Sequence, residues 1–543
     1  MLAVSPTAAV LGALAAGAGL AAADEFPRPY VTDYMPYNEG FYGTHPNQSF
    51  KTTNTFAPLF QVNQWDPSRS GLSRYLFVSN PAGTQQSSPF IIDTKDFSMV
   101  YGDPTWSSVN NPRIQEYNGL PYFTFWEGRD FSGHGLGHCL LYDSSYQQVF
   151  NVSVKMVNTE MDSHECQLTH DGTALVTAYE KIPYDMRNAP GGGPSEGQLL
   201  DSIFEEIDVA TGDLKFLWRA SDHFDINNTE VNWGPDDYGA KTEDVGWDFF
   251  HINSLQKTKA GNYLVSGRRI SSLIHVSGQD GSVLWQLGGK DNQFYDLSGG
   301  NATNFGFQHT ARFLNDDLTE LTLFDNHDLD PGKPSPSCPN GCSRGLHLRL
   351  NYDDPKNYTV EVVHEYYHPM RIASWAMGGF QKLDNGNVLV SWGTTPAITE
   401  YTEDGEIVMD VQLGPWIDEV GNREPVYRAW TMNWTAYPTW NPSVAAGDGY
   451  AYVSWNGATE VDSWDIMEGD TQSNITFTGN VKKVGYETVV PLKTSGAFVV
   501  ANALAADGTV LGTTDVWDME LGATVSSWTQ NPSSFPREVS FAS

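Results

Sequence analysis

The feature that most constrains the fold is a unit that recurs six times, an apolar pair, a polar turn and a second apolar run. The turns are built mainly from Gly, Asx and Ser, which is typical of β-hairpins. Successive units begin roughly 50 to 75 residues apart, enough for four strands and their loops. The pattern predicts a six-bladed β-propeller, with a long β-sandwich array as the alternative. The units begin at Ile91, Leu141, Glu206, Leu273, Leu348 and Ile398.

A second pattern alternates with the hairpins and runs into an apolar strand, with Leu or Phe four places after its first residue. Its copies start at His164, His251, His309 and Gly379. If these are equivalent strands of successive blades, their first residues surround one axis. A sandwich array does not readily produce this second repeat. We therefore expect His251 and His309 to face one pocket at the axis, with His164 further around the same channel.

The chain also divides into domains, because 543 residues are too many for one compact core. Charged residues are few (18%) and aromatic residues many (13%), which favours an all-β fold. From residue 433 the repeat changes to Gly-bounded alternating strands, which predict a small sandwich of fibronectin type III character. The expected order is an N-terminal extension (24–69), the propeller (70–432), the sandwich (433–520) and a polar tail (521–543).

The first 23 residues are expected to be a signal peptide. A run of small apolar residues from Ala8 to Ala23 precedes the charged pair Asp24-Glu25, as at a cleavage site. A membrane anchor is the alternative, but Ala and Gly are weakly suited to span a bilayer. No later segment is long and apolar enough to span, so we expect a secreted, extracellular protein without a membrane span.

Glycosylation sequons agree with secretion. Seven N-x-S/T sequons without Pro are spread along the chain, and they predict N-linked glycans. Their asparagines are Asn47, Asn151, Asn227, Asn301, Asn357, Asn433 and Asn474.

The four cysteines predict two disulfides in an oxidising compartment. Cys338 and Cys342 enclose a Pro-Asn-Gly turn, which leaves Cys139 to pair with Cys166. Zinc is the alternative for four cysteines, but the spacing lacks two C-x-x-C pairs.

The net charge of −35 disfavours nucleic acid and anionic membranes as partners. An anionic ligand would therefore need a local cluster of Arg and His.

Six motifs together resemble the arylsulfotransferase family, most closely its eukaryotic, mainly fungal branch. They occur in the family's order, and the resemblance covers roughly residues 70 to 520. It implies a propeller that moves sulfate between phenols without a nucleotide donor, through a transiently sulfated histidine and further His and Arg groups. The motifs are DFFHINS (248–254), GNYLVSGRR, LWQLGGK, FQHTARF, LFDN and SRG.

The resemblance also implies site residues. His251 and His309 match two channel histidines and are the expected catalytic groups. His164 matches a histidine that opens an earlier blade, and Arg344 is the candidate for the family's arginine. The expected substrate-binding residues are His164, Arg344, Asn253 and Asn326. The family's nucleophilic histidine has no counterpart here, because the run 391–401 carries threonines instead.

Two functions of different classes follow. Sulfuryl transfer mainly needs positioning and stabilised oxyanion charge, which imidazole and guanidinium groups can supply. The first hypothesis is therefore nucleotide-independent transfer from an aryl sulfate to a phenol. The alternative is a non-catalytic propeller that binds glycans, phenolics or a protein. A zinc or copper site on three histidines is a third possibility, although we expect no metal and no cofactor.

Overall fold

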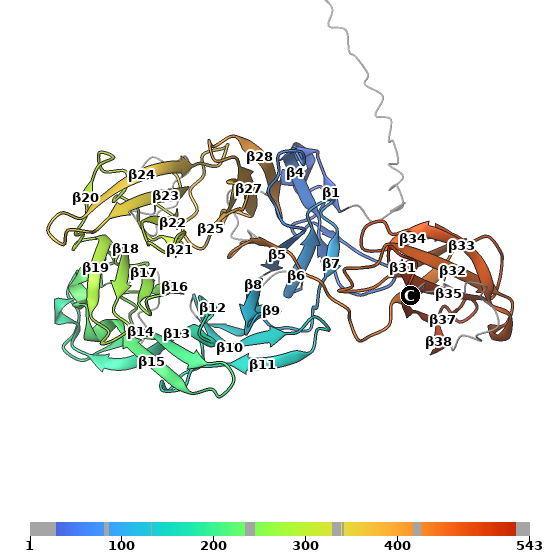
Figure 1. The fold of residues 1–543 in the computed structure, drawn as a ribbon, viewed down its shortest axis with the longest axis horizontal. Helices are drawn as coiled ribbons and strands as arrows, with labels where there is room; N and C mark the ends of the chain where they lie inside the picture. The colour runs from blue at the N-terminus through green and yellow to red at the C-terminus, as the bar shows by residue number, and fades with distance from the viewer. Residues whose placement is uncertain are drawn as a thin grey trace, which may run out of the picture.

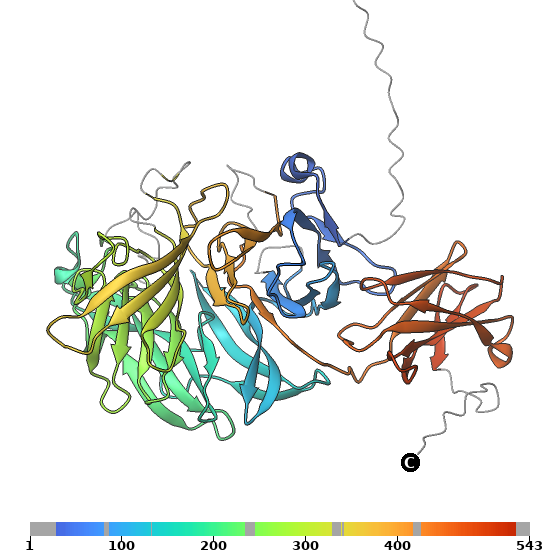
Figure 2. The same ribbon diagram turned by 45° about the horizontal axis from the view of Figure 1, so that its top comes forward.

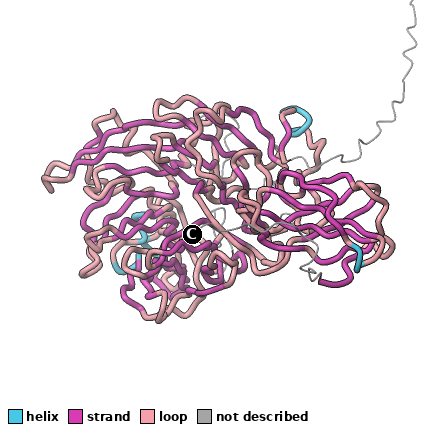
Figure 3. The backbone as a smooth tube through the Cα atoms, turned by 45° about the vertical axis from the view of Figure 1, so that its right-hand side comes forward, coloured by secondary structure: helices cyan, strands magenta, loops and turns pink. Residues whose placement is uncertain are grey.

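The computed structural model describes residues 29–80, 86–131, 133–233, 245–327, 338, 341–415 and 425–527. Strands account for 47% and helix for 4%, which confirms the expectation of a nearly all-β chain. Figure 3 shows the helical turns as short pieces among strands and loops. They are α1 (Tyr34–Asn38), η1 (Met186–Asn188), η2 (Ala220–Asp222), η3 (Ile226–Asn228) and η4 (Gln472–Asn474).

Among the described residues, no helix has the length and apolar character needed to cross a membrane.

Six small sheets form the larger part of the molecule, and each is built on four strands that pair antiparallel. The first three, from the innermost strand outward, are β29 (Trp430–Met432), β5 (Tyr75–Asn80), β6 (Ser88–Asp93) and β7 (Met99–Tyr101); β8 (Val109–Tyr117), β9 (Leu120–Phe131), β10 (His134–Tyr142) and β11 (Gln148–Val152); and β12 (Cys166–Leu168), β13 (Thr173–Tyr184), β14 (Gly197–Asp208) and β15 (Leu214–Arg219).

The other three sheets follow in chain order. They are β16 (Ile252–Lys257), β17 (Tyr263–Gly267), β18 (Ser272–Val276) and β19 (Val283–Gly288); β21 (His309–Phe313), β22 (Glu320–Asp325), β23 (Arg344–Asn351) and β24 (Thr359–Tyr366); and β25 (Gly379–Lys382), β26 (Val388–Ser391), β27 (Ala397–Tyr401) and β28 (Ile407–Gln412). Each sheet is named below by its first strand in chain order.

All six predicted hairpins are the outer strand pairs of these sheets, from β6–β7 to β27–β28. The second repeat forms the inner hairpins β12–β13, β16–β17, β21–β22 and β25–β26. Both patterns were readable because an Asx- or Gly-rich turn and its flanking apolar residues specify a hairpin locally.

The six sheets follow one another around a common centre (Figure 1), and their innermost strands lie nearest to it. Six hydrophobic clusters fill the interfaces between neighbouring sheets, the interface between the last sheet (β25) and the first (β5) included. The first sheet takes its innermost strand, β29, from the far end of the chain. These six sheets, called the ring below, are therefore closed by a strand that is remote in sequence.

The N-terminal segment is part of the ring rather than a separate extension. β4 (Phe60–Trp65) pairs with the outer strand β28, and β1 (Tyr30–Val31) pairs with β4. β2 (Asn47–Gln48) and β3 (Ala57–Pro58) form a small two-stranded antiparallel sheet. In another part of the chain, β20 (Tyr295–Asp296) pairs parallel with the outer strand β24. Phe60 and Val62 pack in the cluster between the last and first sheets, which gives this segment its apolar anchor.

A smaller two-sheet module follows and lies to one side of the ring (Figure 2). Val453 on one sheet and Trp464 and Ala501 on the other share one core. The second sheet continues to Ser527, so the expected boundary at residue 520 is too early. The strands are β30 (Ser443–Gly447), β31 (Tyr450–Ser454) and β34 (Thr488–Pro491), then β32 (Ser463–Gly469), β33 (Thr476–Lys482), β35 (Phe498–Leu504), β36 (Val510–Thr513), β37 (Asp515–Asp518) and β38 (Ala523–Ser527).

Two disulfides join Cys139 to Cys166 and Cys338 to Cys342, in the pairing expected from the sequence. Cys139 lies on β10 and Cys166 begins β12, so the first disulfide links neighbouring sheets.

We expect the double variant Cys139→Ala/Cys166→Ala to lose about 2–4 kcal/mol of unfolding free energy, because the disulfide restricts the unfolded chain. Urea unfolding of the full chain would measure the loss. An unchanged midpoint would show that the packing between the β8 and β12 sheets is sufficient without the disulfide.

Candidate functional site

The histidines of the second repeat lie where inner strands begin at the centre of the ring. His164 lies two residues before β12, His251 immediately precedes β16, and His309 is the first residue of β21. The backbone turns sharply here: φ is +61° at His251 and +54° at Thr310, values that non-glycine residues seldom adopt. These turns direct side chains of different sheets toward one another.

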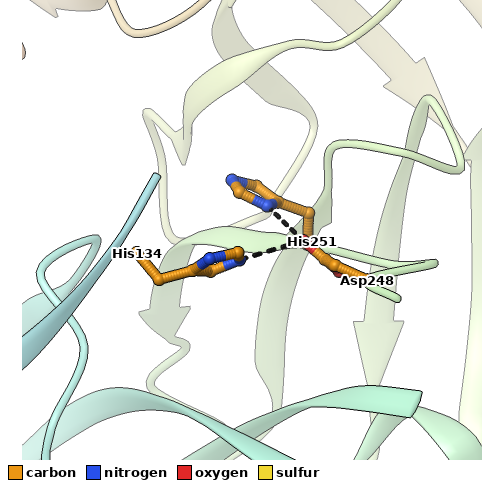
Figure 4. Close-up of side chains that lie close together, drawn as sticks. All are labelled: His134, Asp248 and His251. Carbon is orange, nitrogen blue, oxygen red and sulfur yellow. Dashed lines mark hydrogen bonds and ion pairs between the residues drawn. The ribbon is translucent and has the colours of Figure 1, made fainter. Parts of the chain in front are cut away.

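Asp248 organises one half of the site (Figure 4). Its Oδ2 accepts a hydrogen bond from His251 Nδ1 at 2.6 Å and one from His134 Nε2 at 3.0 Å. Arg269 donates to the Asp248 carbonyl, and its Nε lies 3.6 Å from Oδ2. Burial alone would raise the pKa of Asp248, but Arg269 and the two histidines hold it well below the ordinary value. The carboxylate is therefore ionised and fixes both rings.

Asp162 plays the same part for His164. Its Oδ2 lies 2.6 Å from His164 Nδ1 and also accepts from the His164 backbone N–H and the Thr177 hydroxyl. Its other oxygen accepts from the Gly135 N–H. The pKa of Asp162 is far below the usual range, because these hydrogen bonds and the nearby histidines outweigh its burial.

The two halves of the site contact each other through the rings of His164 and His251. His251 Nε2 lies 3.2 Å from His164 Nε2, with the ring planes at 82° and the centroids 4.7 Å apart. Since each Nδ1 donates a hydrogen bond to a carboxylate, each ring turns its Nε2 toward the other. His164 and His251 retain only 6% and 7% exposure. Burial, followed by the charges of the neighbouring histidines, lowers the pKa of His251 well below its usual value despite Asp248.

His309 is held differently. Its Nδ1 lies 2.7 Å from Asn326 Oδ1, and its Nε2 accepts the Met377 backbone N–H at 3.2 Å. The Asn326 amide donates to the carbonyls of Ser374 and Met377, which fixes its orientation. Burial and the nearby Arg268 lower the pKa of His309 well below its usual value. Both nitrogens of this neutral ring therefore already have protein partners.

Glu165, which follows His164 in the chain, is the centre of a cluster of ion pairs that we call the ionic centre. This fully buried carboxylate contacts Arg113 at 3.0 Å, Arg312 at 2.5 Å and Arg428 at 3.1 Å. It also accepts the Leu255 N–H. Glu165 precedes β12 and Arg428 precedes β29, whereas the other partners lie on β8, β16 and β21. Three arginine side chains and one backbone N–H, from four other sheets, thus converge on one carboxylate.

The predicted site residues are not all brought together. The closest histidine pair is His164–His251, whereas His251 and His309 were expected to be closest. The reason is that Asp162 and Asp248 turn the rings of His164 and His251 toward each other, whereas both ring nitrogens of His309 are held by Asn326 and the Met377 N–H. The charges of His164 and His251 still depress the pKa of His309, so the three rings are within electrostatic reach.

Three of the four expected binding residues, Asn253, Asn326 and Arg344, support the site from outside the His164–His251 pair. Asn253 donates to the Gln308 carbonyl, which braces β16 against the beginning of β21. Arg344 is bound by Asp325 at 2.8 Å, by Glu365 and by Asn304 at 2.7 Å, so its guanidinium is engaged with protein groups.

Sequence reasoning missed His134, Asp162 and Asp248. The spacings D-x-H (162–164) and D-x-x-H (248–251) were visible and place a carboxylate beside each histidine. His134 had no such signal, because it begins the third strand of its sheet, β10. It reaches the site only through the arrangement of the sheets.

Within the part of the chain that the structure describes, one group could contact a cation, namely His134, Asp248 and His251, whose ligand atoms lie within 4.8 Å of one another. The two nitrogens lie 3.0 and 2.6 Å from one carboxylate oxygen. These are hydrogen-bond distances, shorter than the about 3.3 Å between neighbouring ligands of a tetrahedral zinc.

The fold and the site define a β protein with a buried histidine–carboxylate centre. Residues 113–414 match the family model described as arylsulfotransferase (ASST). The chain belongs to the arylsulfotransferase family.

A comparison with curated proteins gives no match. The solved structures similar to the chain include a protein of unknown function from Bacteroides caccae (12% identity, TM-score 0.38, covering 66% of this chain and 98% of the other). They also include a protein from Lactobacillus plantarum (11%, 0.33, 77% and 100%) and Kuenenia stuttgartiensis hydrazine synthase (11%, 0.34, 62% and 75%). At these TM-scores the similarities carry no argument.

Proposed function

We propose that this protein transfers a sulfuryl group from an aryl sulfate to a phenolic acceptor, without a nucleotide, at the centre of a six-bladed β-propeller. The observation that carries the proposal is the His164–His251 pair, two carboxylate-oriented imidazoles whose Nε2 atoms lie 3.2 Å apart. Imidazole groups oriented in this way can act as general bases and, once protonated, as general acids. Membership of the arylsulfotransferase family supplies the substrate class.

The propeller assignment is supported by three features of the ring. Six sheets follow one another in chain order, the strand β29 completes the first of them, and Glu165 gathers groups from four other sheets. We also propose that the C-terminal module, with its two facing sheets, has fibronectin type III character.

The charge at the centre favours an anionic substrate. The protein carries −35 in total, yet the three carboxylates of the histidine and Glu165 clusters stand against five guanidinium groups that lie beside them or beside His309, an excess of two positive charges. This reversal would attract an aryl sulfate to the centre. The groups are Arg113, Arg268, Arg269, Arg312 and Arg428, with Asp162, Asp248 and Glu165.

The roles follow from the contacts. We assign acid–base chemistry to His164 and His251, and contact with the sulfate to Arg268, which lies beside His309. His309, Asn326 and Asn253 position neighbouring segments. Arg344 supports Asp325, next to Asn326, rather than contacting the substrate.

The direct test is to incubate the purified protein with 4-nitrophenyl sulfate and phenol, and to follow phenyl sulfate by mass. We expect product to form only when the protein is present. Binding of the aryl sulfate without product would instead favour a non-catalytic binding propeller. The absence of a histidine from the run 391–401 supports that alternative.

We also propose that the protein is secreted and glycosylated. All seven sequon asparagines are exposed, as a glycan acceptor must be. Two disulfides are consistent with an oxidising compartment.

We expect the secreted protein to begin at or near Asp24, and glycosidase treatment to lower its apparent mass. N-terminal sequencing and gel shift would measure both. An intact, unglycosylated chain from a eukaryotic secretory host would contradict the proposal.

A further inference from the structure

We infer that His134 is a positioning residue of the site: it holds Asp248, and through Asp248 it keeps the His251 ring in one orientation. The inference rests on the proposed function, which assigns acid–base chemistry to His251. His134 begins β10, in a different sheet from the one that His251 precedes. Figure 4 shows both rings directed at the same carboxylate.

The carboxylate of Asp248 depends on His134 for its own orientation. Its Oδ2 accepts two hydrogen bonds, from His251 at 2.6 Å and from His134 at 3.0 Å, and its Oδ1 accepts a longer one, at 3.3 Å, from the Phe250 N–H. Arg269 Nε lies 3.6 Å from Oδ2, near enough to attract the charge but too far for a hydrogen bond that fixes its direction. Because the carboxyl torsion of aspartate has broad minima, the group could turn if His134 did not hold it. His251 would then lose its fixed acceptor.

The beginning of β10 also contacts the other half of the site. Gly135, which follows His134, donates its backbone N–H to Asp162 Oδ1 at 2.7 Å. A Cβ atom at Gly135 would lie 2.6 Å from the Cβ of Ser163, so the two segments are in close contact. Two consecutive residues thus make one hydrogen bond to each of the carboxylates, Asp162 and Asp248, that orient the histidine rings. The beginning of β10 therefore fixes the two Asp–His pairs relative to each other.

The ring of His134 is itself held in place. It is 3% exposed and packs against Tyr179, with ring centroids 4.2 Å apart. The Tyr179 hydroxyl donates to the carbonyl of Ile252, the residue after His251. An apolar ring would fill the same space without an unpaired nitrogen, whereas His134 Nδ1 is buried and has no hydrogen-bond partner among the described residues. What histidine adds at this position is its hydrogen bond to Asp248.

Two variants of similar volume separate this hydrogen bond from the packing. His134→Gln keeps a side-chain N–H that can reach Asp248, whereas His134→Met has no donor. Both lose the ring that packs against Tyr179, so the difference between them reports the hydrogen bond. We expect His134→Met to have a kcat about 10-fold below that of His134→Gln for transfer from 4-nitrophenyl sulfate to phenol, the scale of losing a group that orients a reactive residue. KM should be nearly the same in both, because His134 acts through Asp248 rather than on the substrate.

A second measurement does not depend on turnover. In the full chain labelled with ¹⁵N-histidine, correlation of ring protons with ring nitrogens shows which nitrogen carries the proton, and His251→Asn identifies the His251 signal. Because the ionised Asp248 can only accept, we expect the proton on Nδ1 of His251 in the unaltered protein and in His134→Gln. His134→Met should give a mixture of both neutral forms. If circular dichroism shows that His134→Met does not fold, His134→Phe, which keeps a ring beside Tyr179, takes its place.

The positioning role requires both differences. An unchanged proton position on His251 in His134→Met, or equal kcat in the two variants, would overturn it. A loss of stability alone would show that His134 only supports the fold. If the unaltered protein does not turn over, the proposed function fails, and the ¹⁵N signals alone decide whether His134 orients His251.

Discussion

We expect His251→Asn to lower the turnover of aryl sulfate by roughly 10²-fold or more while the protein remains folded. The asparagine amide can still donate a hydrogen bond toward Asp248, where His251 Nδ1 lies 2.6 Å from the carboxylate. What it lacks is the Nε2 that faces His164. Asparagine also tolerates the φ of +61° at this position. Stopped assays and circular dichroism on the same preparation would measure activity and fold.

Two further variants give this result its meaning. His251→Ala removes the same nitrogen but also places alanine at a left-handed φ, which costs about 1–2 kcal/mol. We therefore expect it to lose as much activity as His251→Asn and, in addition, measurable stability. The control is His138→Asn, which changes a histidine on β10 that pairs with Glu127 and has a 36% exposed side chain, and it should retain full activity. If His251→Asn turns over at the rate of the unaltered protein, the His164–His251 pair is not the reactive group.

Glu165→Gln should have the largest effect on stability, a loss of about 3–5 kcal/mol of unfolding free energy. The substitution keeps the volume of the side chain but leaves Arg113, Arg312 and Arg428 without their common carboxylate in the interior. Water cannot replace it, because Glu165 and Arg428 have fully buried side chains. Urea unfolding of the full chain would measure the change.

The same carboxylate makes stability depend on acid pH. Burial alone would raise the pKa of Glu165, but Arg312, Arg428 and Arg113 lower it from 4.5 to about 2. A carboxyl whose pKa is lower in the folded state stabilises the fold above its unfolded pKa, and this stability is lost as pH falls from 4.5 to about 2. The difference corresponds to about 3 kcal/mol. Glu165→Gln should lack this part of the acid dependence.

Glu403→Gln is the matched control. Glu403 pairs with Lys382 at 2.9 Å, but its side chain is 72% exposed, so we expect a change of about 0–1 kcal/mol. A loss at Glu165 no larger than the loss at Glu403 would show that the arginines find other partners, and that the ionic centre does not hold the inner strands together.

The sequence by itself determined the hairpins, the disulfides and the order of the sheets. Each hairpin depends on about a dozen consecutive residues, such as Glu206–Trp218, whose turn and apolar flanks suffice to define it. The positions of His164, His251 and His309 at the beginnings of inner strands followed from the same regularity.

Only the tertiary structure decided which of these side chains meet. His134 comes from a third strand, Asp248 is shared by two histidines, and Glu165 gathers arginines from β29 and from strands on both sides of β12. These contacts depend on how far each sheet turns about the centre and on the left-handed residues where strands begin. Both are set by packing between sheets that lie far apart in the chain, so no local pattern encodes them.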